Sequence, residues 1–341
     1  MFANVYQGKR VLVTGHAGFC GSWLSLWLRR LGAEVIGYGH PPNTEPNHYL
    51  LVNLMTISSW ENCLLDFNKL REVMKREQPD LVIHLAAKAI VARTFTEPRE
   101  TFENNVMGAV NILEVCRQCP SVKGIVMITT DKVYEDKNWL WGYREVDMLE
   151  GKDPYSASKV CVEQVIRCYR ESFGMNIATA RAGNVIGGGD WNEKRLIPDT
   201  MKATAKGEAV EIHVPNATRP WQHVLEPLSG YLLLGQKILQ SEDVNGAWNF
   251  GPDSEMTVLE VLKVAQSVWP KIQYVIKEEE THRFMVNLLK IDSTKARKLL
   301  GWKPKWDMVH AVMMAVLWYK VYYETGHILT AEDIRDYEGD E

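Results

Sequence analysis

The chain has 341 residues, of which 46% are hydrophobic and 24% are charged, and its formal net charge is −4. This balance is typical of a soluble globular protein with one large or two modest domains, and it gives no basis for non-specific nucleic-acid binding. No apolar run reaches the roughly 18 residues that indicate a membrane span, and no secretory signal is visible, so we expect a cytoplasmic protein. The six cysteines show no disulfide framework. We interpret the Cys116-x-x-Cys119 pair as reduced thiols and expect no metal.

Apolar runs alternate with helical patterns along the first half of the chain. This alternation predicts βαβ units and a Rossmann-type, doubly wound parallel sheet. Strands are expected at residues 11–14, 34–38, 81–85, 124–129 and 176–181, and helices at residues 22–31, 67–77, 101–118 and 155–172. Beyond a glycine run, the pattern predicts helices at 195–206, 225–239 and 256–268, with strands at 211–214 and 246–250. Residues 331–341 form an acidic end that we expect to be loose.

A glycine-rich turn follows the first predicted strand at once. Gly15, Gly18 and Gly21 have the spacing G-x-x-G-x-x-G, and a helix is predicted directly after them. Glycine permits a tight turn and lets a pyrophosphate approach the backbone, while the helix N-terminus supplies oriented N–H groups. The turn therefore predicts a dinucleotide-binding site.

Thr130 follows the predicted strand at 124–129. Ligands of open α/β sheets bind outside the carboxyl ends of the strands, so the Thr130 hydroxyl is placed to hold a substrate oxygen. The alternative is a capped turn, which threonine and aspartate also favour.

Tyr155 and Lys159 are four residues apart in a predicted helix. Residues i and i+4 share a helix face, so the ammonium can lie close to the phenol and lower its pKa. Such a pair is common on exposed helices. It indicates catalysis here because the glycine turn and Thr130 precede it.

With these motifs, the chain resembles the extended short-chain dehydrogenase/reductase family over nearly its whole length. Longer blocks resemble the sugar-nucleotide dehydratase branch, and are most similar to CDP-glucose 4,6-dehydratases, at residues 18–28, 139–145, 181–191, 195–199 and 219–228. The resemblance implies a Rossmann domain formed by residues 1–185 and about 222–250. It also implies a smaller α/β lobe, formed by residues 186–221 and 251–330, that binds the nucleotide sugar.

The resemblance implies NAD as a retained cofactor. The residues alone leave NAD and NADP open, because the second predicted strand ends without the acid typical of NAD sites and without an arginine for NADP. His40 stands there as a candidate contact. The other cofactor contacts that the resemblance implies are Phe19, Asp66, Phe67, Ala86 and Ala87, together with the three glycines, Tyr155 and Lys159. Asn105 resembles the family's asparagine that steadies the active-site helix.

The resemblance implies dehydration of a nucleotide-activated hexose, most similar to the conversion of CDP-D-glucose to CDP-4-keto-6-deoxy-D-glucose. Tyr155 would remove the C4 hydroxyl proton, Thr130 would hold that oxygen, and Lys159 would lower the tyrosine pKa and hold the nicotinamide ribose. Asp131 suits protonation of the departing C6 hydroxyl if burial raises its pKa. Lys132 could remove the C5 proton only if it is neutral, which requires desolvation or a positive neighbour; otherwise it orients Asp131.

The substrate contacts that the resemblance implies are Asn184, Arg195, Arg219 and His223, since arginine suits a diphosphate. Lys88 and the segment around Arg283 depart from the pattern of the CDP-glucose enzymes. Both segments approach the hexose in the family, so we include Lys88 and Arg283 as candidates and leave the sugar open.

Two other functions remain as alternatives. A dehydratase or C4 epimerase acting on a different nucleotide sugar would keep Tyr155 and Lys159, although an epimerase does not need Asp131 and Lys132. A nucleotide-binding scaffold without turnover is disfavoured by the complete set of Thr130, Tyr155 and Lys159. The resemblance also implies a homodimer formed through helices 101–118 and 155–172.

Overall fold

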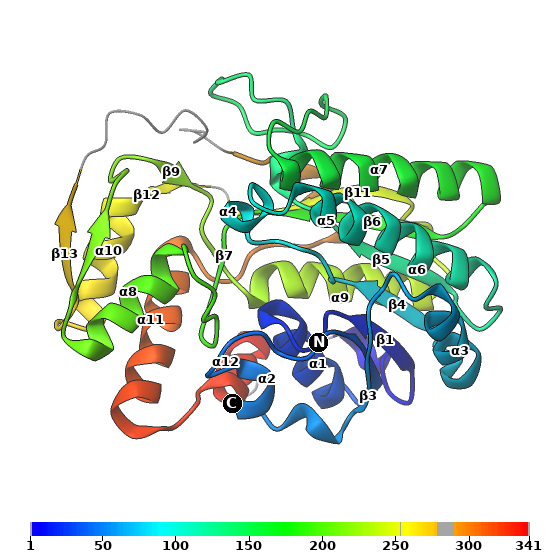
Figure 1. Ribbon diagram of the computed structural model, residues 1–341, viewed down its shortest axis with the longest axis horizontal. Coiled ribbons are helices and arrows are strands. Elements are labelled where there is room, and N and C mark those ends of the chain that lie inside the picture. Colours follow the sequence, from blue (N-terminus) through cyan, green and yellow to red (C-terminus); the bar gives the residue numbers. More distant parts are fainter. Residues whose placement is uncertain (1, 253, 278–289, 340–341) are drawn as a thin grey trace.

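A seven-stranded parallel sheet forms the centre of the protein, as the computed structural model shows (Figure 1). The structure describes residues 2–252, 254–277 and 290–339. The strand order is β11-β6-β5-β4-β1-β2-β3, and helices cover both faces, each over its own hydrophobic core. The predicted Rossmann-type, doubly wound sheet is therefore confirmed.

The elements of this domain agree with most of the predicted positions. Its strands are β1 (Arg10–Thr14), β2 (Glu34–Gly39), β3 (Ser58–Glu61), β4 (Leu81–His84), β5 (Gly124–Ile128), β6 (Ile177–Ala182) and β11 (Gly246–Phe250). Its longer helices are α1 (Phe19–Arg30) and α9 (Leu225–Leu239) on one face, and α3 (Phe67–Glu77), α6 (Gly108–Arg117) and α7 (Pro154–Phe173) on the other. Short helices are α2 (His48–Leu51), α4 (Val91–Thr94) and α5 (Pro98–Phe102), and a π-helical turn at Glu103–Met107 joins α5 to α6.

Capping residues set both ends of α7. The side chain of Asp153 accepts hydrogen bonds from the backbone N–H groups of Tyr155 at 2.9 Å and Ser156 at 3.0 Å, and Pro154 occupies the first turn. These are strong helix-start signals because they satisfy N–H groups that no helical carbonyl can reach. Gly174, in the left-handed conformation, ends the helix.

Most of the remaining elements lie beside the sheet, around β8, β13 and α10 in Figure 1, whereas α12 lies next to α1 and α2. They are β7 (Val185–Ile186), α8 (Leu196–Lys206), β8 (Ala209–Ile212), β9 (Thr218–Arg219), β10 (Gln222–His223), β12 (Met256–Thr257), α10 (Val258–Val268), β13 (Gln273–Ile276), α11 (Met308–Thr325) and α12 (Thr330–Glu338). The strands of this group pair into three two-stranded sheets, β10-β7, β12-β9 and β13-β8. The division into two domains at the predicted boundaries stays a prediction. Among the described residues, no helix is long and apolar enough to cross a membrane.

The expectation of a loose acidic end was wrong for residues 331–338. They belong to α12, in which Ile334 and Tyr337 are buried at 0% and 1% exposure. The Tyr337 hydroxyl donates a hydrogen bond to Glu226 at 2.7 Å, and its ring meets those of Trp27 and Trp306 edge-on. Two apolar residues three positions apart give an otherwise acidic segment one face that packs on the core.

We expect Tyr337→Ala to lower the free energy of unfolding by about 3–5 kcal/mol, the usual cost of removing a buried aromatic ring. Urea denaturation followed by far-UV circular dichroism measures this. Asp336→Ala, at an exposed position of the same helix, is the matched control and should change stability by less than about 0.5 kcal/mol. Equal, small effects of both substitutions would mean that the end of the chain is not packed in solution.

Candidate active site

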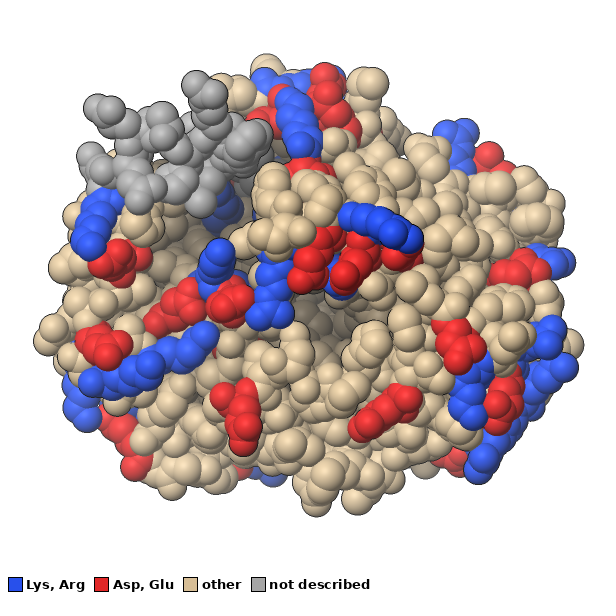
Figure 2. All heavy atoms as spheres, viewed as in Figure 1, with Lys and Arg blue, Asp and Glu red and all other residues tan. Residues whose placement is uncertain are grey.

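The candidate site residues gather at the carboxyl ends of β1, β4, β5 and β6. The glycine turn follows β1, Ala86 and Ala87 follow β4, and Thr130 and Asp131 follow β5. Because neighbouring parallel strands end at the same edge of a sheet, these segments meet there. Figure 2 shows a hollow near the middle of the molecular face, with basic and acidic side chains beside it.

The glycine turn is packed so closely that larger residues would not fit. Gly15 has a φ of +72°, and a Cβ added to it would lie 2.9 Å from Ala86 Cα. A Cβ on Gly21 would lie 2.1 Å from the carbonyl oxygen of Gly15. Helix α1 then begins at Phe19, and its N-cap residue, Gly18, supplies no side chain to bind the N–H groups of the first turn. Such a turn fits a dinucleotide pyrophosphate.

The other cofactor candidates lie near this turn or on neighbouring strands. His40 is exposed directly after β2. Asp66 caps α3 by accepting a hydrogen bond from the Lys69 N–H at 3.0 Å, and Phe67 packs against the core below. Ala86 and Ala87 are half-buried beside Gly15. Their contact with a cofactor stays a prediction.

Thr130, Tyr155 and Lys159 are all buried. Burial raises the pKa of Tyr155 to about 12, against a hydrogen bond with Thr130 and the positive charge of Arg195, which lower it. Lys159 donates a hydrogen bond from Nζ to the carbonyl oxygen of Ile128 at 2.9 Å. The pKa of Tyr155 is therefore raised rather than lowered as expected, because burial outweighs the effect of the nearby positive charge.

Asp131 is an acid enclosed by the protein, at 2% exposure. Burial raises its pKa to about 6, although Lys132, Thr130 and Arg219 oppose that shift. Its Oδ1 accepts a hydrogen bond from the Thr130 hydroxyl at 3.1 Å. Oδ2 has no hydrogen-bond partner among the residues that the structure describes. A carboxyl group in this state can carry and release a proton near neutral pH.

Lys132 differs from its neighbour because its side chain is exposed. A neutral lysine base requires desolvation or a nearby positive charge. Because the Lys132 side chain is not buried, the structure supports the second of its two expected roles, the orientation of Asp131 by charge, better than the role of C5 base.

Asn105 links two segments of the site. Its Oδ1 accepts from the Lys88 N–H at 2.8 Å, and its Nδ2 donates to Ser158 Oγ at 2.8 Å. Ser158 in turn donates to the carbonyl oxygen of Tyr155 at 2.7 Å. Asn105 thus connects the segment after β4 to the first turns of α7. This position agrees with the expectation that Asn105 steadies the active-site helix.

Arg195 and Arg219 place positive charge beside the catalytic candidates. Arg195 forms an ion pair with Asp190 at 2.9 Å, and its charge acts on Tyr155. Arg219 is half-buried and its charge acts on Asp131. Asn184 is half-buried directly after β6 and Gly183.

The structure changes the expectation for one predicted substrate contact. His223 is completely buried, with its ring against Trp23 and Trp306, and burial lowers its pKa to about 3. It therefore belongs to the core rather than to an accessible contact surface. Arg283 lies outside the described residues.

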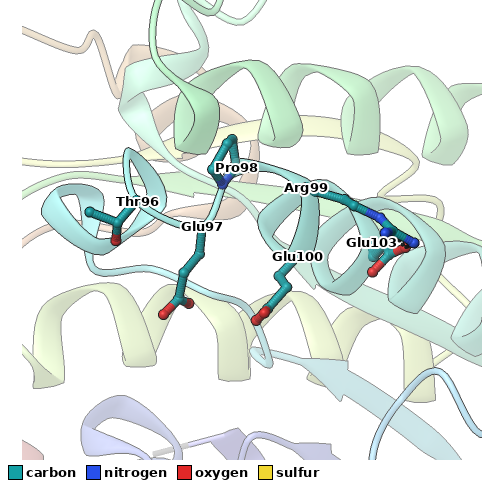
Figure 3. A pocket seen from close by; sticks show the side chains of 6 residues that line it. All are labelled: Thr96, Glu97, Pro98, Arg99, Glu100 and Glu103. Atoms are coloured by element: carbon teal, nitrogen blue, oxygen red, sulfur yellow. Dashed lines mark hydrogen bonds and ion pairs between the residues drawn. The ribbon is translucent and has the colours of Figure 1, made fainter.

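Lys88 is engaged by two carboxylates. Its Nζ forms ion pairs with Glu97 at 2.7 Å and with Glu100. Both glutamates extend toward the same side in Figure 3, and they line a surface cavity of about 420 Å³ that also includes Thr96, Pro98, Arg99 and Glu103. The charge that Lys88 was expected to offer the hexose is thus already paired in this structure.

Three residues of the site were not identified from the sequence. Glu163, on α7, and Arg181, on β6, form a buried ion pair at 2.8 Å. Gly183, two residues after Arg181, makes room for Asp131, because a Cβ there would lie 1.7 Å from Asp131 Oδ2. The acid four residues after Lys159 was a usable signal for Glu163, since i and i+4 share a helix face.

The parallel Rossmann sheet, with Tyr155 and Lys159 buried at its carboxyl edge, defines the class as the extended short-chain dehydrogenases/reductases. Residues 12–314 match the family described as GDP-mannose 4,6 dehydratase, and the chain belongs to this family. It is 41% identical to the CDP-glucose 4,6-dehydratase of Salmonella typhimurium, over 98% of this chain and 97% of that protein.

Solved structures agree with the fold. The UDP-glucose 4-epimerase of Thermus thermophilus in complex with NAD is 25% identical, with a TM-score of 0.81, over 91% of this chain and 99% of that one. The dTDP-glucose 4,6-dehydratase of Bacillus anthracis in complex with NAD is 22% identical, with a TM-score of 0.77, over 93% and 98% of the two chains.

We expect Gly183→Ala to lower the free energy of unfolding by about 1–3 kcal/mol, because the methyl group must displace the Asp131 carboxyl. The same substitution in an Asp131→Ala background should cost at least about 1 kcal/mol less, since the displaced group is gone. Urea denaturation of the four proteins gives this coupling energy. Additive effects would show that Gly183 does not make room for Asp131.

Proposed function

We propose that this protein dehydrates CDP-D-glucose to CDP-4-keto-6-deoxy-D-glucose and keeps NAD bound through the cycle. The observation that carries the proposal is Asp131, a buried acid placed directly beside Thr130 at the end of β5. Elimination of water needs such an acid, whereas epimerisation at C4 does not. The 41% identity with a CDP-glucose 4,6-dehydratase over nearly both chains supports the nucleotide and the sugar.

The residues at the carboxyl edge of the sheet fit NAD. The tight turn of Gly15, Gly18 and Gly21 and the uncapped start of α1 would hold the pyrophosphate. Lys159, buried and within hydrogen-bond distance of Ile128 O, would hold the nicotinamide ribose. When bound, NAD supplies the chemistry of accepting a hydride from C4 and returning one to C6.

At C4, Tyr155 takes the proton of the hydroxyl group, and Thr130 holds the oxygen. Burial makes ionisation of Tyr155 costly, and the Thr130 hydrogen bond and the charge of Arg195 reduce that cost. The product is a C4 ketone, which acidifies the hydrogen on C5.

At C5 and C6, Asp131 gives its proton to the departing C6 hydroxyl, so that water leaves, while the C5 proton passes to a base, the role for which Lys132 in its neutral form is the candidate. Asp131 suits this role because burial keeps its pKa near neutrality. Arg219 and Lys132 place positive charge beside the carboxylate that remains. We assign Arg195, Arg219 and Asn184 to the diphosphate and sugar, because the guanidinium fork meets phosphate oxygens in two places.

We further propose a cytoplasmic homodimer that serves deoxysugar and polysaccharide biosynthesis. Support for the dimer comes from apolar side chains that are exposed at Phe102 and Met107, within the predicted interface segment 101–118, and at Phe173, the last residue of α7.

Purified protein mixed with CDP-glucose and catalytic NAD should yield a product lighter by one water, detected by mass spectrometry. Tyr155→Phe is the matched control: it removes one hydroxyl and should keep CDP-glucose binding while reducing turnover about 10²–10⁴-fold. Intact CDP-glucose after incubation with the unmodified protein would overturn the proposal. A panel of other nucleotide sugars, with epimerisation followed by NMR, would then be the next experiment.

Asp131 should act in its protonated form, so kcat/KM should fall as the pH rises above about 6. We expect Asp131→Asn to lose this descending limb and to slow water loss about 10²–10⁴-fold, while transient reduction of NAD persists. Stopped-flow absorbance at 340 nm and product mass spectrometry separate the two steps. Failure of the C4 hydride transfer in this variant would show that the division of roles between Asp131 and Tyr155 is wrong.

A further inference from the structure

Glu163 is a buried carboxylate, at 7% exposure, that the proposed reaction does not use directly. Its Oε1 accepts hydrogen bonds from the Thr129 hydroxyl at 2.7 Å and from Arg181 Nε at 2.8 Å, and its Oε2 accepts from Arg181 Nη2 at 3.0 Å. One side chain of α7 is therefore tied to the end of β5 and to β6.

Each partner of Glu163 is next to a residue of the site. Thr129 directly precedes Thr130 and Asp131. Arg181 lies two residues before Gly183, which leaves the space that Asp131 occupies. Glu163 itself is one helical turn after Lys159 and two turns after Tyr155.

We infer that Glu163 is the positioning residue that holds the Tyr155–Lys159 helix in register with the Thr130–Asp131 segment and sets its carboxylate one helical turn from Lys159. This inference rests on the proposed function. A bidentate arginine–carboxylate pair fixes both partners in direction as well as distance. The Thr129 hydrogen bond extends that constraint to the segment that directly follows β5 and leads into Thr130.

The charges around the pair agree with this role. Burial lowers the pKa of Lys159 to about 8, and the negative charge of Glu163 opposes that shift. His84 on β4 also faces Lys159, and burial and the Lys159 charge keep it neutral by lowering its pKa to about 3.

Arg181 has its own surroundings. Its Nη1 donates to Tyr134 Oη at 3.0 Å and to the carbonyl oxygen of Glu145 at 3.2 Å. The charges of Glu145 and Lys295 also act on it. The negative charge of Glu163 lowers the cost of the buried positive charge on Lys159.

The test is Glu163→Gln, with Glu171→Gln as the matched control. Glu171 is on the same helix but exposed, and it pairs with Arg167. In Glu163→Gln, we expect kcat with CDP-glucose to fall about 10²-fold, the usual effect of a small misplacement of reacting groups. KM should change less than threefold, and Glu171→Gln should leave both constants unchanged. A role in stability alone would leave kcat per folded molecule at the wild-type value, which would overturn the inference.

A second measurement does not depend on turnover. The free energy of unfolding is compared between the wild type and Glu163→Gln from pH 7 to pH 9.5. Below about pH 8 Lys159 is charged in the folded protein, and without Glu163 that charge is more costly. As the pH rises, Lys159 becomes neutral and no longer needs the carboxylate, so the stability deficit of the variant should shrink.

The two measurements separate the possible failures. A deficit that stays constant with pH would overturn the electrostatic part of the inference. If wild-type protein does not convert CDP-glucose, the proposed function fails while the pH comparison still decides whether Glu163 supports the charge of Lys159.

If Glu163→Gln does not fold, the double variant Glu163→Leu, Arg181→Met replaces both buried charges together, a change that proteins often tolerate. It should fold and still show the fall in kcat. Wild-type kcat in that double variant would overturn the inference.

Discussion

The buried ion pair between Glu163 and Arg181 is the contact on which the geometry of the candidate site depends. It joins α7 to β6, and the Thr129 hydrogen bond adds β5. Leaving one partner of a buried pair without the other typically costs about 3–5 kcal/mol, so these three elements resist separation. Thr130, Asp131 and Gly183 lie within two residues of this junction in the sequence, and Lys159 and Tyr155 lie one and two helical turns from it on α7. Their relative positions are therefore a property of the core rather than of flexible loops.

Burial is also what gives the site its chemistry. The same exclusion of water raises the pKa of Asp131 to about 6 and lowers that of Lys159 to about 8. An acid and an amine thus carry exchangeable protons in a range close to neutrality, although their ordinary pKa values lie far apart. Tyr155 responds in the opposite direction to what a nearby cation would cause, since its pKa is raised. Arg195, which comes from a different segment of the chain, supplies positive charge that acts on Tyr155 and lowers its pKa only in part.

Much of the fold could be predicted because long buried strands and amphipathic helices leave a clear period in the sequence. Such patterns predicted the strand before the glycine turn and the helix that carries Tyr155 and Lys159. Asp131 was predicted from its place directly after a buried strand. β3 was not predicted, because its residues, Ser58–Glu61, are mostly exposed and lack an apolar run. α12 was misjudged because two apolar side chains decide its packing within an acidic segment.

The contacts within the site were harder to predict than its residues. The sequence shows Lys88 and His223 but does not reveal which residues contact them. The pairing of Lys88 with Glu97 and Glu100 depends on how the segment after β4 folds back. The burial of His223 depends on the rings of Trp23 and Trp306, which lie more than 80 residues away in the sequence, before and after it. The role of Gly183 could not be predicted from the sequence, because the reason for a glycine there is the Asp131 carboxyl beside it, and only the structure shows that contact.

The indole of Trp27 connects the two ends of the chain to the cofactor turn. Phe2 meets this ring from the N-terminal side and Tyr337 from the C-terminal side, both edge-on. Trp27 belongs to α1, the helix whose other end carries the glycine turn. Loss of the final residues through proteolysis, or a bulky fusion placed there, would therefore uncover the back of the helix that faces the dinucleotide. A circular permutation that joins the two ends would instead preserve that packing, with new termini placed in an exposed loop.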